Sequence, residues 1–356
     1  NAFADVSLLD GLTFRTNLGV ETINFRRNIY LPSTLATNNS PTSSVSNPNL
    51  RNIYAGQNNG QNYNWLWENT LTYERTLNQH HTLSLLAGYA AQKNTYEGSN
   101  VNGRTGSFGN DLVPYVTNSI DIVGGAYKGA STLLSLFGRV NYGFKDRYLV
   151  SAALRRDGSS RFGPDSRFAL FPSASAAWRV SKEPFFTNKK IISDLKIRAS
   201  YGVTGNQNIP DYTWVARVNS DNYNYGAGTG TRVPGFAPGG FTNRELTWET
   251  NTQTDVGLDV GFFDQRILLT ADAYVRQTTG LLNNRPLPSL VGYATSVQAN
   301  IGNIENKGLE LALETRNTTG ALRWTTTANI AFNRNKVVSL VNDQSLFFTS
   351  LFGWPN

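Results

Sequence analysis

The sequence has 356 residues, a net charge of +7 and neither cysteine nor methionine. Hydrophobic residues make up only 39% of it and charged residues 16%, whereas aromatic residues reach 12%. The lack of cysteine excludes disulfides, thiolate metal sites and cysteine nucleophiles, and no apolar run approaches the roughly 20 residues of a membrane helix. The basic residues do not cluster as in a nucleic-acid-binding patch, so we expect no nucleic-acid partner.

Apolar and polar residues alternate along most of the chain, which predicts strands with one apolar and one polar face. Many of these strands reach or exceed the roughly 10 residues that a tilted strand needs to cross a bilayer. In chain order, we predict strands near residues 2–9, 12–20, 65–74, 83–89, 133–144, 148–157, 168–179, 195–201, 256–262, 267–276, 309–314 and 321–336.

Aromatic residues gather toward the predicted strand ends, as in the interfacial girdles of membrane barrels. We assign Trp65, Trp67, Tyr148, Trp178, Tyr201, Trp248, Phe262, Phe263 and Trp324 to such girdles. The alternative for these residues is the core of a soluble β-sandwich, whose strands are usually shorter.

The predicted connections alternate between short and long. The short ones are Asp10-Gly11, Asn78–His81, Lys145-Asp146, Phe263–Gln265 and Thr318–Gly320, and Ser181–Ser193 is somewhat longer. The long ones are Arg27–Asn62, Gly98–Ala130, Gly205–Arg244 and Gly280–Ile304. Outer-membrane barrels have short periplasmic turns and long extracellular loops. We therefore predict an all-β fold: a transmembrane antiparallel up-and-down β-barrel in contact with outer-membrane lipid, with about a dozen strands in this chain.

Charged residues occupy only the polar face of the predicted strands. Facing lipid near the midplane, each would cost roughly 2–4 kcal/mol, so we expect them to line the barrel lumen. The lumen candidates are Arg139, Arg155, Lys196, Arg198, Asp255, Asp259, Asp272 and Arg276. Two roles stay open for them: hydrating the wall or bracing a plug by ion pairs, and contacting substrate directly.

Aromatic residues in the long loop 205–244 are the ligand or partner candidates, because aromatic faces stack on sugar rings and anchor protein partners. They are Tyr212, Trp214, Tyr223, Tyr225 and Phe236. The alternative is that the loop packs on itself. Asp157–Ser160 is predicted to be a tight turn in which Gly158 supplies a positive φ.

No residue pattern predicts catalysis, a metal site or a cofactor. His80 and His81 are the only histidines, and they lie in a predicted turn without carboxylates at ligand spacing. The glycine-rich run at 226–230 lacks the strand, helix and Lys-Ser or Lys-Thr context of a phosphate loop. We expect neither an enzyme nor a bound cofactor.

Five segments, in this order and spacing, resemble the C-terminal half of the SusC/RagA family of TonB-dependent outer-membrane transporters. They are Arg155–Gly163 with Arg167–Ser173, Ala177–Ser181, Asp194–Asn206, Leu246–Thr250 with Val256–Asp259, and Ile301–Glu310. The resemblance is densest from Thr132 to Asn335, and the preceding part fits by strand pattern alone.

This resemblance implies a barrel of about 22 strands in the bacterial outer membrane, gated by an N-terminal plug on which TonB pulls. It also implies a SusD-like lipoprotein on the outer face and import of glycans, oligosaccharides or peptides. No plug, TonB box or closing strand is recognisable, so residues 1–356 are expected to be a partial barrel domain. A different hypothesis is that the barrel is a structural or interaction scaffold in an envelope assembly.

Overall fold

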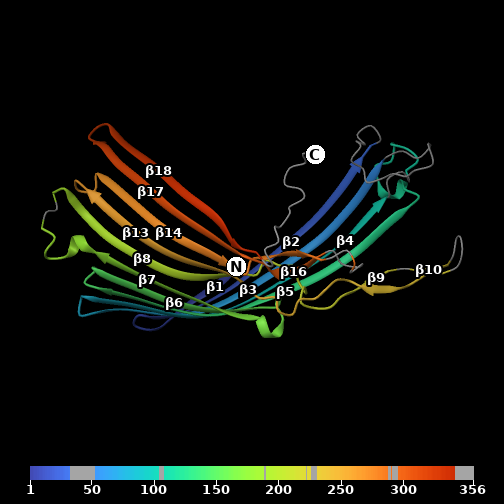
Figure 1. Cartoon of the computed structure of the whole chain (residues 1–356), viewed down its shortest axis with the longest axis horizontal. Coiled ribbons are helices and arrows are strands. Elements are labelled where there is room, and N and C mark those ends of the chain that lie inside the picture. The colour runs from blue at the N-terminus through green and yellow to red at the C-terminus, as the bar shows by residue number, and fades with distance from the viewer. Residues whose placement is uncertain are drawn as a thin grey trace. The chain divides into compact units, whose positions relative to one another are not determined.

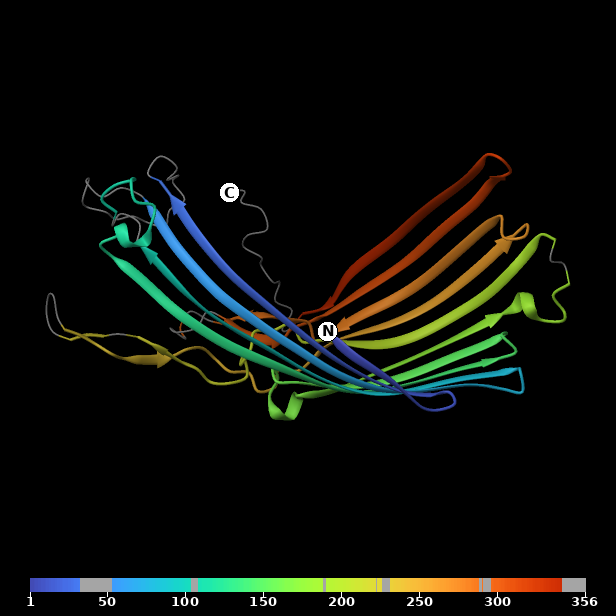
Figure 2. The ribbon, with the colours of Figure 1, turned by 180° about the vertical axis from the view of Figure 1, so that it is seen from behind.

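The long strands of this protein form one antiparallel sheet. The computed structural model describes residues 1–32, 53–103, 108–187, 190–221, 223–225, 231–287, 290 and 296–340. Twelve strands pair in chain order, as Figures 1 and 2 show from the two sides. They are β1 (Ala2–Leu9), β2 (Leu12–Leu31), β3 (Tyr54–Leu77), β4 (His81–Gly103), β5 (Ile122–Phe144), β6 (Tyr148–Ser159), β7 (Phe168–Arg179), β8 (Ile192–Asn206), β13 (Glu249–Phe262), β14 (Ile267–Thr279), β17 (Asn303–Thr319) and β18 (Arg323–Ser339). The predicted all-β, antiparallel, up-and-down arrangement is confirmed.

The short turns explain why neighbouring strands pair in order. Lys145 and Asp146 both have positive φ, 52° and 53°, and Arg147 N donates to Phe144 O at 2.9 Å. Two successive left-handed residues match the twist of antiparallel strands. Asn78 and Gln79 repeat this geometry between β3 and β4. The predicted short turns at Asp10-Gly11, Lys145-Asp146 and Phe263–Gln265 are confirmed.

Several strand limits differ from the sequence prediction. β2 and β3 occupy much of the predicted loop Arg27–Asn62, and β4 and β5 occupy both ends of the predicted loop Gly98–Ala130. His81 begins β4 instead of lying in the turn, and the last turn lies after Thr319, later than predicted. β3 has 24 residues, roughly 80 Å of strand, so its end remote from the short turn extends beyond a bilayer.

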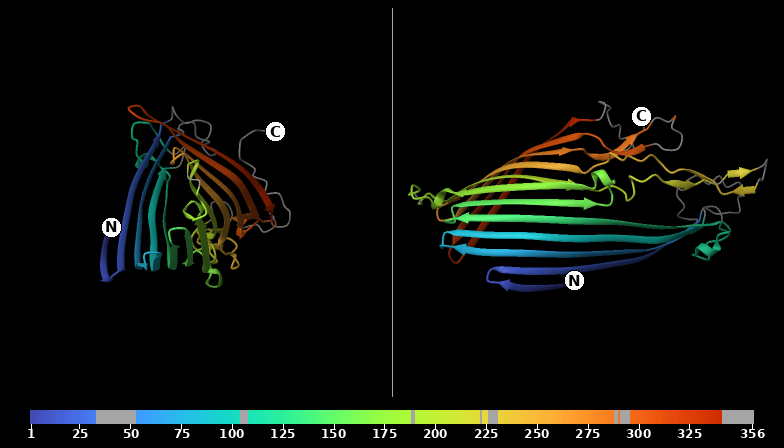
Figure 3. Two further views of the ribbon diagram at one scale, coloured as in Figure 1. Left: turned by 90° about the vertical axis from the view of Figure 1, so that its left-hand side faces the viewer. Right: turned by 90° about the horizontal axis from the view of Figure 1, so that it is seen from below.

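Two predicted loops contain secondary structure. The connection between β8 and β13 holds β9 (Val218–Ser220), β10 (Tyr223–Tyr225), β11 (Thr231–Val233) and β12 (Phe236–Pro238), in which β9 pairs with β12 and β10 with β11. Figure 3 shows this segment reaching beyond the ends of β8 and β13. The connection between β14 and β17 holds the paired strands β15 (Leu282–Pro286) and β16 (Ser296–Asn300).

The apolar face of the long strands is largely exposed in the isolated chain. On β18, for example, Trp324, Ile330 and Phe332 are each more than half exposed, while the opposite face carries threonine and asparagine. Apolar surface of this extent needs a covering partner, and a bilayer supplies one. Trp248 departs from its predicted girdle position, because it is only 5% exposed and lies within a cluster between connections.

Aromatic rings lie over glycines of adjacent strands at several places in the sheet. A Cβ added to Gly158 would lie 2.2 Å from a ring carbon of Phe168, its neighbour across the β6–β7 ladder. The predicted tight turn at Asp157–Ser160 is therefore wrong: β6 continues to Ser159, and Gly158 has no positive φ. Glycine stands there because the ring fills the space of a side chain. Phe137 on Gly88 and Tyr274 on Gly308 repeat this arrangement.

The chain divides into two compact units, which we describe separately. One comprises residues 1–3, 17–68 and 91–133, and the other comprises 4–16, 69–90 and 134–356. The first has a small buried cluster of Ile53, Ala55 and Phe108. Helical structure in the described residues is limited to short turns at Val116–Asn118 (η1), Pro164–Ser166 (η2) and Val180–Lys182 (η3). None of the described helices is long or apolar enough to cross a membrane.

Candidate functional site

The cross-strand register places six of the eight lumen candidates on one face of β8, β13 and β14. Asp259 pairs with Lys196, Gly257 with both Arg198 and Asp272, and Gln253 with Arg276. Asp255 shares the face because it lies two residues from Gly257. We call this side of the sheet the polar face.

Arg198 is the centre of an ion-pair network on the polar face. Its Nε and Nη2 atoms donate to the two carboxylate oxygens of Asp259, each at 3.0 Å, and Nη2 also donates to Asp272 at 2.9 Å. Lys196 Nζ lies 3.7 Å from Asp259. The guanidinium matches a carboxylate bidentately and so links three strands. Asp255 forms no ion pair with the described residues, so the five charges sum to −1.

The other predicted lumen residues lie apart from this network. Arg276 donates from Nε and Nη2 to Gln253 Oε1, at 3.0 and 2.8 Å. Arg155 binds Asp157 through Nε at 2.8 Å, donates to Ser135 and covers the Phe137 ring. Arg139 is exposed and has no ion pair within the described ranges.

Two adjoining cavities lie on the polar face beside the network. The first, of about 620 Å³, is lined by Glu74, Asn141, Lys196, Arg198 and Asp255 among others. The second, of about 530 Å³, is lined by hydroxyl and amide residues and by Arg276. Ser151, Ser175 and Ser200 line both. The polar face therefore offers a hydrated, hydrogen-bonding surface next to paired charges.

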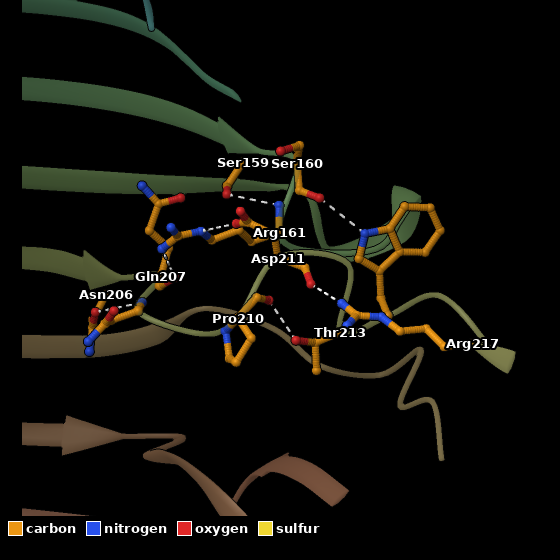
Figure 4. Close-up of polar contacts among 11 residues, drawn as sticks. Ser159, Ser160, Arg161, Asn206, Gln207, Pro210, Asp211, Thr213 and Arg217 are labelled. Carbon is orange, nitrogen blue, oxygen red and sulfur yellow. Dashed lines mark hydrogen bonds and ion pairs between the residues drawn. The ribbon is translucent and has the colours of Figure 1, made fainter. Parts of the chain in front are cut away.

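The connections at the opposite end from the short turns are fastened to one another by polar contacts (Figure 4). Arg161 Nε donates to Asp211 Oδ1 at 2.8 Å, and that carboxylate is almost fully buried. Arg217 donates to the backbone oxygen of Asp211, and Trp214 Nε1 donates to Ser160 O at 3.1 Å. These bonds join the β6–β7 connection to the beginning of the β8–β13 connection. We call this set of fastened connections the outer-end layer.

A hydrophobic cluster lies under the outer-end layer. The ring of Trp248 lies 5.0 Å from that of Phe162 and 5.5 Å from that of Phe171, and its Nε1 donates to Arg167 O at 3.1 Å. Phe162 and Leu246 are fully buried. Next to this cluster, Glu249 accepts hydrogen bonds from Asn206 and from Leu282 N.

The loop aromatics are only partly brought together. Trp214 is half-buried and held in the outer-end layer, as the self-packing alternative expects. Tyr212 is 43% exposed, has a positive φ of 63°, and lies beneath the Arg217 guanidinium. Phe236 is 77% exposed on β12. Tyr223 and Tyr225 lie on β10, but their side chains fall outside the described part of the chain.

The short-turn end carries a separate charged group. Asp146 pairs with Arg179 at 2.8 Å and with Lys182. The Lys182 hydrogen bond, followed by attraction to Arg179, holds the pKa of Asp146 below its usual range. Glu183 is nearly buried, and hydrogen bonds from Tyr148 and Trp178 lower its pKa as well. These contacts tie the β5–β6 turn to the β7–β8 connection.

The histidines form no metal site with the described residues. His81 Nδ1 lies 2.7 Å from Tyr142 Oη, and its ring packs on Phe144. No cluster of three or more histidine, cysteine or acidic side chains within the described ranges is placed to hold an ion.

A family model described as "TonB dependent receptor-like, beta-barrel" matches residues 3–350. The chain belongs to the TonB-dependent receptor β-barrel family. It is 36% identical over 99% of its length to TonB-dependent receptor P3 of Formosa agariphila, and 37% identical over 60% of its length to TonB-dependent receptor SusC of Bacteroides thetaiotaomicron. It covers 34% and 22% of those two proteins, so it spans about a third of P3 and less of SusC.

A solved structure supports the same placement of this TonB-dependent receptor barrel. This chain resembles a chain of the RagAB peptide transporter with a TM-score of 0.79 and 27% identity, and the match covers 95% of this chain and 36% of the transporter chain. The resemblance to the SusC/RagA family and the outer-membrane location are confirmed. Three of the stretches that carry the sequence resemblance, 155–163, 167–173 and 246–250, contribute residues to the outer-end layer and its cluster, which the sequence prediction did not identify.

Proposed function

We propose that this chain forms part of the barrel wall of a TonB-linked outer-membrane transporter that imports nutrient oligomers. The observation that carries the proposal is the family match along nearly the whole chain, on a sheet with one apolar and one charged face. Since the family consists of receptors and not enzymes, the expected chemistry is binding and passage, without covalent steps. Residues 1–356 then represent part of the barrel domain.

In this proposal the polar face lines the lumen. The Arg198 network and the adjoining cavities offer charges and hydroxyls to water, and Asp255 keeps an acceptor that no described cation occupies. We propose that these groups hydrate the wall and brace a plug, and that direct substrate contact is secondary. Arg139, Arg155 and Arg276 extend the same charged lining along the strands.

The proposed partners follow from the relatives. A TonB protein would act through a plug, and a SusD-like lipoprotein would cover the outer face, where the outer-end layer presents Tyr212 and Phe236. Tyr223, Tyr225 and Trp214 remain candidates in the same loop. The cargo class proposed is a glycan, oligosaccharide or peptide, and the RagAB relative is a peptide transporter by its description.

The test uses the full-length receptor in its native outer membrane. Intact mass spectrometry in mild detergent should find a chain well above 39.2 kDa with a bound lipoprotein. Growth on oligomeric nutrients should then depend on TonB and on this receptor. A barrel that binds envelope components but supports no TonB-dependent uptake would contradict import and favour the scaffold hypothesis.

A further inference from the structure

Three cations lie on the apolar side of β17 and β18, which are neighbours in the sheet (Figure 1). Arg334 and Lys336 follow Phe332 at even spacing on β18, and Phe332 is 55% exposed on the apolar face. Side chains alternate along a strand, so both cations share that face. The register pairs Arg334 with Lys307 and Lys336 with Glu305, and paired residues point to the same side of a sheet. We call Lys307, Arg334 and Lys336 the basic patch.

The basic patch lies where the apolar band of this hairpin ends. Trp324, near the short turn, and Arg334 are separated by about 33 Å along β18. At the usual strand tilt of roughly 35–45°, this distance gives about 25 Å of height, the thickness of the apolar band of outer-membrane barrels. Between these two positions the described residues of this face are uncharged: Leu309, Leu311, Leu313, Thr315, Thr326, Ala328, Ile330 and Phe332. Since short turns lie on the periplasmic side, the patch is at the depth of the outer-leaflet headgroups.

The one carboxylate beside the patch does not neutralise it. Glu305 Oε1 lies 2.9 Å from Lys307 Nζ, and Glu305 Oε2 accepts a hydrogen bond from Gln277 at 3.4 Å. Arg334 and Lys336 are exposed and form no ion pair within the described ranges. Three cations and one carboxylate leave a net charge of +2. Lys307 and Arg334 stand directly opposite each other, and like charges so placed destabilise a sheet. An anion between them removes this repulsion.

The chemistry of the patch fits a phosphate group carried by a lipid. An arginine fork binds two phosphate oxygens at once, and a lysine adds a point charge. Basic residues beside a membrane surface are attracted to anionic lipids. A lipid supplies the anion at this depth, and its acyl chains cover the apolar band below the patch. A phosphate ion from solution makes the same polar contacts but lacks the apolar ones.

We propose that Lys307, Arg334 and Lys336 bind the phosphate of an anionic lipid in the outer leaflet, whose acyl chains lie along Leu309 and Phe332. The site faces away from the lumen. It is therefore separate from the passage of cargo and goes beyond the proposed import function. A further strand pairing with β18 would use backbone groups, so these side chains would still face the lipid in a closed barrel.

The experiment measures lipid binding to the purified, delipidated full-length receptor by native mass spectrometry. The probes are monophosphoryl lipid A, the same lipid after enzymatic removal of its phosphate, and inorganic phosphate as a competitor. The wild type should bind the phosphorylated lipid at least tenfold more tightly than the dephosphorylated one. Arg334→Gln/Lys336→Gln, which keeps the pair of Lys307 and Glu305, should weaken this binding at least tenfold, and Arg334→Gln alone at least threefold. Glu305→Gln removes the acidic neighbour and should strengthen binding at least twofold.

The matched control is Arg316→Gln/Arg323→Gln, which removes two cations from the short-turn end of the same hairpin and should bind within twofold of the wild type. Native heat-modifiable mobility shows that each variant is folded. An equal loss in the control, or unchanged binding by folded Arg334→Gln/Lys336→Gln, overturns the proposal. So does equal binding of the dephosphorylated lipid, or displacement of the lipid by equimolar inorganic phosphate. Protection of Lys336 from amine labelling by a second protein chain, and not by the lipid, also overturns it.

Discussion

Replacing Trp248 should open the outer-end layer while leaving the strands paired. Trp248 is 5% exposed, packs on Phe162 and Phe171, and donates to a backbone carbonyl. Truncating a buried tryptophan to alanine costs about 3–5 kcal/mol. Trp248→Phe keeps most of the packing and removes one of the two hydrogen bonds that the Arg167 carbonyl accepts, since Ser159 N still donates to it, at about 0.5–1.5 kcal/mol.

Hydrogen exchange on the full-length receptor measures this effect, because a destabilised layer opens locally before the sheet does. At about 1.4 kcal/mol per tenfold change, exchange in residues 207–221 should accelerate about 100- to 4000-fold in Trp248→Ala. The acceleration in Trp248→Phe should be only about two- to twelvefold. Strand amides of β6 and β7 should keep their protection.

Trp178→Ala is the matched control, since Trp178 also donates from Nε1, to Glu183, but lies at the short-turn end. It should leave exchange in 207–221 unchanged. The reasoning would be refuted if Trp248→Ala exchanged like the wild type there. It would also be refuted if the whole barrel lost heat-modifiable mobility, because the cluster would then support the sheet itself.

Two further predictions concern the charged groups. Arg198→Met leaves two carboxylates on the polar face without their cation and should destabilise the receptor by about 1–2 kcal/mol. The loss is smaller than for a buried pair because these side chains are partly exposed. Thermal unfolding in detergent should show a clearly lower midpoint for Arg198→Met, which Arg276→Met does not reproduce. Asp146 has a folded-state pKa held below its ordinary value by Lys182. Its stabilising contribution is therefore present above the unfolded pKa and lost as pH falls through the folded pKa. The gap in unfolding midpoint between wild type and Asp146→Asn should be widest at pH 7 and should narrow as the pH falls below the ordinary range of an aspartate, and a gap that stays constant or widens on acidification would contradict this sign.

The two faces of the sheet were predictable because side chains alternate strictly along a strand. Arg198 and Asp259 alternate with apolar residues along β8 and β13, so the sequence alone places both on the polar face. Their pairing was not predictable, because it depends on the register between β8 and β13. The second ion pair of Arg198 also needs the register between β13 and β14 that brings Asp272 to the same guanidinium. Alternation shows which face of the sheet each side chain occupies, but not how far neighbouring strands are shifted along one another.

The strand ends were missed for a different reason. Between Asn58 and Asn64, asparagine, glycine and glutamine occupy both faces of β3 at every position except Tyr63. Beyond the bilayer neither face needs to be apolar, so the alternating signal ends while the hydrogen-bonded ladder continues. Composition rich in asparagine and glycine then predicted a loop where a strand lies.

The outer-end layer was missed because it joins connections distant in sequence. Trp248 follows a loop and precedes a strand, as an interfacial girdle residue would, and only packing on Phe162 distinguishes the two positions. One signal was present: the segments at 155–163, 194–206 and 246–250, quoted for the resemblance, all flank outer connections. Segments that all lie beside outer connections are expected to pack together at that end of the sheet.

The rings on Gly88, Gly158 and Gly308 bear on how the sheet assembles. A slip of two residues between strands keeps every side chain on its own face, so burial alone does not oppose it. It would, however, drive each ring into a residue that has a side chain and leave the glycine bare. Each such pair therefore fixes the register between its two strands. A pairing shifted by two residues is disfavoured before the next strand is added.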